Sequence, residues 1–295
     1  MTTKDTSTPY SKPIPKIIQQ RYSCRTYLRL SIEKEIRKHL DDYAAVLHTG
    51  PLGGPARFEL VAGKDGDLKE LKSLGTYGFI KGATGFIVGA TTADAKHLED
   101  FGYLNEKIIL LATDLGLGTC WLGGTFTKTS FGKRIAVREG ELVPSVAAVG
   151  YIAKKPRRID ALIRRGAKAN KRRPWEKLFF NDGFHSPLTY REAGDYATPL
   201  QMVRLAPSAS NKQPWRVVKD ESGWHFYLQR TSGYQERSLV KFYTVADLQR
   251  IDMGIAMCHF DLSAREIGLQ GEWLVDEPPF KKPGELTEYT ASWLV

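Results

Sequence analysis

The spacing of apolar positions divides the chain into short helices and strands that alternate from one end to the other. Residues 31–43 carry apolar side chains at helical spacing, and Ser31 is placed to cap the first turn. Residues 225–230 alternate between apolar and polar as an edge strand does, and residues 194–206 predict a helix that ends before a proline-bounded turn. Four short apolar runs are typical of strands: residues 58–63, 84–91, 145–153 and 215–220. Because helices and strands interleave throughout, we expect an α+β layered sandwich.

The pattern also repeats. When the sequence is shifted by 152 residues, positions 100–122 and 252–274 share eight identities without a gap, among them Gly116 with Gly268 and Trp121 with Trp273. Each copy predicts an amphipathic helix that ends at a glycine and is followed by a turn. This period is too long for a solenoid, so we expect an internal pseudo-dimer of two related halves, residues 1–183 and 184–295, packed as one unit.

Each half has lost a different turn. Residues 205–218 display polar side chains between two prolines, whereas the corresponding residues 48–61 offer none between theirs. Conversely, "GLGTCWLGG" (Gly116–Gly124) is small and apolar, but its counterpart "GLQGEWLVD" (Gly268–Asp276) carries acidic residues. Independent drift of two loops would also produce differences. A single retained site built from both halves would leave this reciprocal pattern.

Positive charge is concentrated in one segment. The formal net charge is +10, and residues 154–173 contain ten Lys or Arg and one Asp. Three interpretations stay open for this segment: a nucleic-acid surface, a solvated face, or a phosphate-binding segment for a small cofactor. The segment has no interleaved aromatic residues and no recognisable DNA-binding motif.

Other classes of protein are disfavoured. No apolar run reaches the ~18 residues of a membrane span, and the polar, proline-interrupted residues 1–16 predict a loose tail rather than a signal peptide. The three cysteines are widely separated and show no metal-ligand spacing with histidine. We therefore expect reduced thiols, a cytoplasmic location and no metal.

Two motifs point to a bound cofactor. In extended backbone, Arg21, Ser23 and Arg25 would project on one side, and arginine binds phosphate bidentately. The glycines of Gly116–Gly124 would let the backbone approach a flat ligand closely. No catalytic serine, cysteine or nucleotide-binding signature accompanies them, which indicates that a cofactor carries the chemistry.

These motifs together resemble those of nitroreductase-family flavoenzymes. "RYSCRTY" resembles the family's R-x-S-x-R opening, "GLGTCWLGG" its G-L-G-T segment, "APSASNKQPW" its A-P-S-x-x-N-x-Q-P-W turn, and "KRRPWEKL" its basic tail. Their order is similar to that of the tandem, single-chain branch, over residues 16–275. The resemblance implies an FMN-binding nitroreductase-like fold in which the flavin lies between two subunits, a role that the two halves would take here. A monomer would then suffice.

The resemblance also implies a site. Arg21 and Ser23 would face the flavin phosphate and ribityl chain, and Arg25 the pyrimidine edge, where its charge favours the reduced flavin. Where relatives have polar contacts, this chain has "TYGFIKGA" (Thr76–Ala83), so pyrimidine recognition there is unassigned. The residues expected to bind the cofactor are Arg21, Ser23, Arg25, Trp121, Leu122, Gly123, Gly124, Arg172, Arg173, Pro207, Ser208, Ala209 and Asn211. No catalytic side chain is predicted, because the flavin is the reactive group.

The function that follows is an FMN-dependent NAD(P)H oxidoreductase of nitroreductase type. Its small-molecule electron acceptor would be a nitroaromatic, a quinone or another electron-poor compound. The alternative is a flavin-binding or sensing protein without turnover, which would not oxidise NAD(P)H. Nucleic-acid binding is a third hypothesis, which predicts a colourless protein, and we expect neither this partner nor a membrane.

Overall fold

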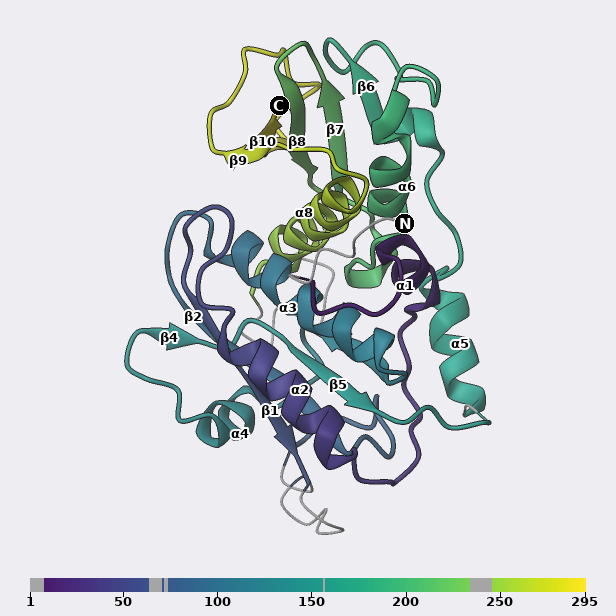
Figure 1. Cartoon of the computed structure of the whole chain (residues 1–295), viewed down its shortest axis with the longest axis vertical. Coiled ribbons are helices and arrows are strands. Elements are labelled where there is room, and N and C mark those ends of the chain that lie inside the picture. Colours follow the sequence, from purple (N-terminus) through teal and green to yellow (C-terminus); the bar gives the residue numbers. More distant parts are fainter. Residues whose placement is uncertain (1–7, 64–70, 72–73, 156, 234–245) are drawn as a thin grey trace.

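Two five-stranded sheets lie at opposite ends of the protein, with two long helices between them (Figure 1). The computed structural model describes residues 8–63, 71, 74–155, 157–233 and 246–295. The first sheet has the order β1-β2-β5-β3, with β4 beside β2, and all of its pairs are antiparallel. Its strands are β1 (Ala56–Ala62), β2 (Gly85–Thr92), β3 (Gly118–Leu122), β4 (Glu141–Leu142) and β5 (Val146–Gly150).

The second sheet repeats this connectivity. Its order is β6-β7-β8-β10-β9, in which β7-β8-β10-β9 corresponds to β1-β2-β5-β3 and β6 is an added parallel strand. Strand β8 is central and almost wholly buried, so the expectation of an edge strand was wrong: neighbours pair with it on both sides. The strands are β6 (Phe179–Asn181), β7 (Trp215–Lys219), β8 (Gly223–Gln229), β9 (Glu272–Leu274) and β10 (Thr287–Leu294).

The two central helices, α3 (His97–Asp114) and α8 (Leu248–Glu266), confirm the predicted repeat of a helix and a glycine stop. Gly116 and Gly268 have φ of 83° and 84°, a conformation that glycine adopts without strain. Leu117 N donates to Ala112 O, and 152 residues later Leu269 N donates to Ala264 O. The expected amphipathic character was wrong, since both helices are buried on nearly all sides between the sheets and each other.

Two glycines set the distance between the central helices. A methyl group added at Gly102 would lie 2.3 Å from the carbonyl oxygen of Ile251, and one added at Gly254 would lie 1.8 Å from that of Glu99. Both the glycines and their partners are related by the same shift of 152 residues. This reciprocal contact is the one expected at a two-fold interface between like subunits.

The remaining helices cover the outside (Figure 1). Helix α2 packs on β1 and begins at Lys34 with Glu33 at the cap position, so the predicted cap at Ser31 was two residues early. Helix α1 contacts α3, α6 and α8, and so belongs to both halves. The α-helices are α1 (Ile14–Gln20), α2 (Lys34–Ala45), α4 (Lys128–Arg134), α5 (Arg158–Gly166) and α6 (Ala197–Leu205), and the 3-10 turns are η2 (Trp175–Lys177), η3 (Gly194–Tyr196) and η4 (Ala209–Asn211).

Two segments at the ends of the halves differ from the predictions: the N-terminal tail and the boundary between the halves. The backbone and hydroxyl of Ser11 and the ammonium of Lys12 bind Asp114, so this part of the predicted loose tail is held in place; residues 1–7 lie outside the described residues. Strand β6 precedes the predicted boundary at residues 183/184 but pairs in the second sheet. The sheets would therefore divide the chain before Phe179.

Within the described part of the chain, no helix is both long and apolar enough to cross a bilayer.

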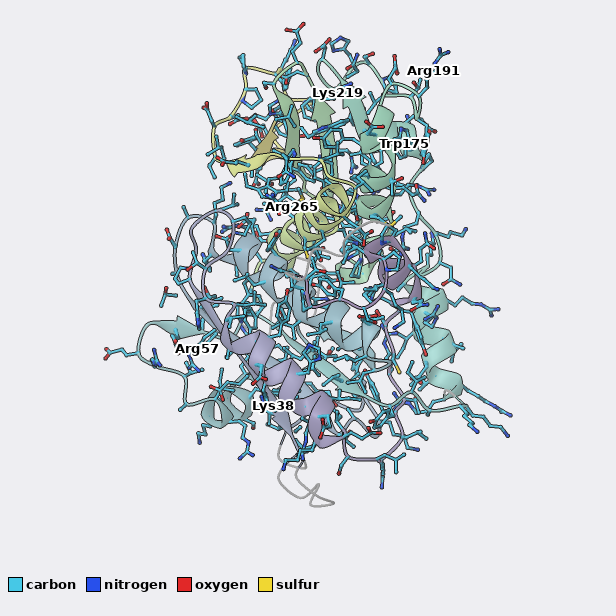
Figure 2. The ribbon with its side chains drawn as sticks, in the orientation of Figure 1. Lys38, Arg57, Trp175, Arg191, Lys219 and Arg265 are labelled. Carbon is cyan, nitrogen blue, oxygen red and sulfur yellow. The ribbon has the colours of Figure 1, made fainter. Side chains whose placement is uncertain are left out.

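An ion pair at the rim of the first sheet gives a pH-dependent prediction. Arg57, labelled in Figure 2, binds both carboxylate oxygens of Glu141 at 2.9 and 2.7 Å. These bonds lower the pKa of Glu141 from 4.5 to about 2. A carboxyl group whose pKa is lowered by folding stabilises the folded state at any pH above its ordinary, unfolded pKa. This stabilisation is lost as the pH falls through the lower pKa of the folded state.

We therefore expect Glu141→Gln to lower the free energy of unfolding at pH 7 by ~1.5–3 kcal/mol, since charged hydrogen bonds are lost. The difference from wild type should shrink below pH 4.5 and vanish near pH 2. Urea unfolding at several pH values measures it. Glu59→Gln is the control, because Glu59 also binds Arg57 but is half exposed, and its loss should cost less than ~1 kcal/mol. Equal losses at every pH would contradict the prediction.

Candidate functional site

The arginine segment, residues 21–25, lies directly beside strand β3. Ser23 bridges to Thr119, and Cys24 N donates to Thr119 O over 2.8 Å. The contact requires Gly118, because a methyl group there would lie 2.7 Å from Ile152 and 3.0 Å from Cys24. The fold thus brings the predicted R-x-S-x-R and G-L-G-T motifs together, although about 90 residues separate them.

Arg21 lies over a buried carboxylate. Its side chain is 6% exposed, its Nε atom is 3.9 Å from Glu106 Oε1, and that Nε has no hydrogen-bond partner among the described residues. Glu106 Oε2 accepts the indole N–H of Trp121 at 2.7 Å. Burial lowers the pKa of Arg21, which the charge of Glu106 partly offsets. Arg21 is therefore a buried cation with an unsatisfied donor.

The basic segment, residues 168–173, contributes a second, half-buried cation. Arg172 donates to the carbonyl oxygens of Ala169 and Leu205 and, at 3.4 Å, to Asn211 Oδ1, but its Nε is buried and has no partner within the described part of the chain. Burial, together with the nearby charges of Arg21 and Arg204, lowers the pKa of Arg172 to about 10. Arg21 and Arg172 are thus held close enough to repel each other. Such an arrangement fits an anion between them.

The second-half turn, residues 205–213, is built to hold that basic segment. Asn211 Nδ2 donates to Lys168 O and Lys171 O at 2.8 and 3.0 Å, and Gln213 Oε1 accepts the backbone N–H of Arg173 at 2.7 Å. Asn211 and Gln213 have φ of 54° and 51°, which few residues other than glycine adopt. The polar groups that the sequence displayed here therefore contact the protein backbone.

The same turn is tied to helix α8. Ala209 N donates to both carboxylate oxygens of Asp252, at 3.0 and 3.1 Å, and Ser208 Oγ accepts Gln213 N at 2.9 Å. Asp252 is 3% exposed, and its burial raises its pKa well above the ordinary value. Pro207 and Ala209 are half-buried at the start of this turn. Their backbone is positioned by contacts within the second half.

The remaining predicted residues differ in their exposure and contacts. Gly123 lies against the second half, since a methyl group there would lie 2.6 Å from Leu248 of α8, while the Trp121 indole binds Glu106 of α3 in its own half. Leu122 is 3% exposed and packs in the core of the first half, so the structure leaves only its backbone for a ligand. The side chain of Arg173 reaches Lys212 O at 3.4 Å, and the residue is exposed. Gly124 is half-buried after β3.

The segment that departed from the resemblance lies next to Arg25. Lys81 N donates to Arg25 O, and Tyr27 N donates to Lys81 O, which forms a short parallel contact beside the arginine segment. Arg25 is half-buried and its Nη1 donates to Ser23 O at 3.2 Å. Thr76–Ala83 therefore borders the predicted pyrimidine edge with backbone groups.

Sequence reasoning missed Glu106, Asp252 and His259. Asp252 had one signal, since it matches Asp100 in the repeat, but nothing in the sequence marked it as an anchor. Glu106 and His259 lie inside helices, where charged residues usually face water. Only their burial, at 0% exposure for both side chains, distinguishes them. Within the described ranges, no group of three or more metal-ligating side chains is present.

A family model described as "Putative TM nitroreductase" matches residues 13–264, which include the arginine segment, the basic segment and the second-half turn. The chain belongs to this nitroreductase family. No curated protein matches it.

One solved structure agrees with the fold of this nitroreductase-family chain over its whole length. A structure titled as a putative nitroreductase from Thermotoga maritima is 20% identical, covers 100% of this chain and 99% of its own, and has a TM-score of 0.58. Two half-length matches have TM-scores of 0.37: an FMN-dependent nitroreductase from Clostridium difficile R20291, 21% identical over 48% of this chain and 88% of its own, and a nitroreductase with bound FMN from Bacteroides fragilis, 17% identical over 50% and 92%.

In this nitroreductase-family chain, the second copy of the motifs has different contacts from the first. There Trp273 donates to Asp261 at 3.1 Å, as does Tyr103 from the other half at 2.6 Å, and Arg265 also pairs with Asp261. Arg265 lies between the two halves (Figure 2). A solvent-open cavity of about 640 Å³ adjoins this network and is also lined by Glu272. The acid, base and aromatic groups here satisfy one another.

Proposed function

We propose that this chain is an FMN-dependent NAD(P)H oxidoreductase that reduces an electron-poor small molecule such as a nitroaromatic or a quinone. One observation carries the proposal. Arg21 and Arg172, one from the arginine segment and one from the basic segment, each hold a buried Nε without a partner among the described residues. Buried polar groups rarely lack partners, and a phosphate group would satisfy both.

The residues therefore fit FMN. The flavin would supply the hydride-transfer chemistry, as this cofactor does in enzymes. Arg21, Ser23 and Arg172 would hold its phosphate and ribityl chain, and Arg25 would place a positive charge at the pyrimidine edge. Trp121 to Gly124, with Arg173, would border the site from the first half. Pro207, Ser208, Ala209 and Asn211 would border it from the second half, partly by holding the basic segment in position.

The pseudo-two-fold contacts support the proposal of an internal duplication in which one chain completes its own site. The two sheets share a connectivity, and the glycine contacts between α3 and α8 are reciprocal. A monomer would then suffice where separate subunits would need to pair. The three free cysteines are all buried, which suits the reducing cytoplasm that we propose as its location.

The nucleic-acid hypothesis has less support. Arg157 donates to the carbonyl oxygens of Gly78 and Phe79, Arg164 lies over the Tyr22 ring, and Arg172 donates to the Leu205 carbonyl at the turn. Several charges of the basic stretch thus point into the protein. The flavin-binding alternative without turnover shares the same site. It is separated from the enzyme by whether the flavin-loaded protein oxidises NADH or NADPH when menadione or nitrofurazone is supplied.

Arg172→Ala tests the phosphate assignment. We expect it to weaken FMN by about ten-fold or more, because a charge-assisted hydrogen bond contributes ~1.5–3 kcal/mol, while riboflavin, which lacks the phosphate, loses less than about two-fold. Fluorescence titration of both flavins measures this. Arg165→Ala is the control, since Arg165 is exposed on α5 in the same basic stretch. Equal losses of FMN and riboflavin would remove the phosphate role.

A further inference from the structure

A buried acid–base pair joins the two halves beneath the proposed site. Glu106 of α3 and His259 of α8 are both 0% exposed, and Glu106 Oε1 lies 2.9 Å from His259 Nε2. The other oxygen of Glu106 accepts the Trp121 indole, and the other ring nitrogen of His259 lies 3.0 Å from the carbonyl oxygen of Met202. Apart from each other, the pair is thus held by two partners, Trp121 of the first half and Met202 of the second half.

The hydrogen bonds determine how many protons the pair holds. A carbonyl oxygen can only accept, so His259 Nδ1 must carry a hydrogen for Met202. The contact between Nε2 and Oε1 also requires one hydrogen, because a carboxylate oxygen and a bare ring nitrogen both accept. Whichever of the two atoms holds that hydrogen, the pair as a whole has no net charge. Burial away from water favours this neutral arrangement.

The net charge of this pair determines how far the charge of Arg21 is neutralised. Its Nε is 3.9 Å from Glu106 Oε1, which is beyond hydrogen-bond length, and that oxygen is bound to His259 instead. The Cys120 thiol also acts on Arg21, but burial raises its pKa to about 11, so it is uncharged at neutral pH. Arg164 and Arg172 add positive charge nearby. Arg21 thus keeps a charge that the pair, which is neutral as a whole, offsets only in part.

We propose that His259 is a positioning residue that occupies Glu106 and so keeps Arg21 available for the phosphate of FMN. The inference rests on the proposed function. Without the ring of His259, Glu106 would carry a full negative charge with one free oxygen, and Arg21 is its nearest cation. A bond between Arg21 and Glu106 would turn the guanidinium away from the anion site. His259 itself does not reach the flavin in this account.

The test compares FMN with riboflavin, since a loss of packing would weaken both. His259→Leu should weaken FMN about ten-fold and riboflavin less than two-fold, as measured by fluorescence titration. His259→Gln is a second variant: the amide can donate to Glu106, but it brings no extra proton, so the pair becomes negative and the FMN preference should again fall. The double variant His259→Leu with Glu106→Gln removes the charge and should restore the preference to within about three-fold of wild type.

Tyr103→Phe is the matched control for the junction between the halves. Tyr103 donates across the same junction to Asp261, but at the second copy, so its loss should lower stability without changing the FMN preference. A wild type that binds FMN and riboflavin equally would remove the phosphate assignment itself. A wild type with the preference, and His259 variants that keep it or lose both flavins equally, would overturn the inference alone. Failure of the double variant to recover would do the same.

Discussion

Asp252→Ala is expected to weaken FMN binding by about a hundred-fold, the largest effect on the site outside the arginines. Both oxygens of Asp252 accept the backbone N–H of Ala209, and this buried bond fixes the second-half turn on α8. That turn in turn holds the basic segment through Asn211 and Gln213. Loss of a buried hydrogen bond to a carboxylate costs ~1.5–3 kcal/mol, and the upper value corresponds to roughly a hundred-fold.

The chain offers an internal control in Asp100. Its carboxylate accepts the backbone N–H groups of Leu52 and Gly54, at 2.9 and 2.5 Å, and so fixes the first-half turn as Asp252 fixes the other. Asp100→Ala should lower the melting temperature much as Asp252→Ala does, because both remove a buried anchor of the same kind. FMN affinity should stay within about two-fold of wild type, since the first-half turn has no polar groups for a flavin.

Titration should also give one FMN per chain in wild type. At the second copy, Asp261 is satisfied by Tyr103, Trp273 and Arg265, and Glu272 adds negative charge at the cavity. Acidic groups there would oppose a phosphate and a flavin that becomes anionic on reduction. Two flavins per chain, or equal FMN losses in the Asp100 and Asp252 variants, would contradict a single site composed from both halves.

Gly254→Ala is expected to give the largest loss of stability. The added methyl group would lie 1.8 Å from the backbone oxygen of Glu99, a distance at which the two central helices must separate. Overpacking usually costs ~1–3 kcal/mol, and a backbone-to-backbone clash at the centre of the core should reach about 3 kcal/mol or more. The melting temperature should then fall by at least about 6 °C, at roughly 2 °C per kcal/mol for a protein of this size.

Gly102→Ala should behave in the same way, because the contact is reciprocal and its methyl group would meet Ile251 O at 2.3 Å. Gly166→Ala is the control. It lies at the end of α5, and a methyl group there meets nothing within 4 Å. Alanine is the better helix former by ~0.5–1 kcal/mol, so this variant should be neutral or slightly stabilised. Thermal unfolding of the three variants measures these changes. Unchanged melting temperatures for the Gly102→Ala and Gly254→Ala variants would show that the helices do not approach this closely.

Much of the fold could be predicted because it depends on local signals. The helix, glycine stop and turn recur at Gly116 and Gly268 because only glycine adopts their φ without strain. The short apolar runs predicted β1, β2, β5 and β7 to within a few residues, because such runs are typical of strands. The start of α2 was misplaced because a serine near a helix does not by itself form the cap.

The sequence by itself thus determined the order of elements, the repeat, and the motifs that place the chain in its family, all of which are carried by neighbours along the chain. Only the tertiary structure decided how these parts are used. Strand β8 became central and α3 and α8 became buried because partners from elsewhere covered them. The contacts of Glu106 with His259 and of Arg172 with Leu205 join residues far apart in the sequence. Such contacts leave no periodic signal, because burial and hydrogen bonding across the two halves depend on packing rather than on spacing.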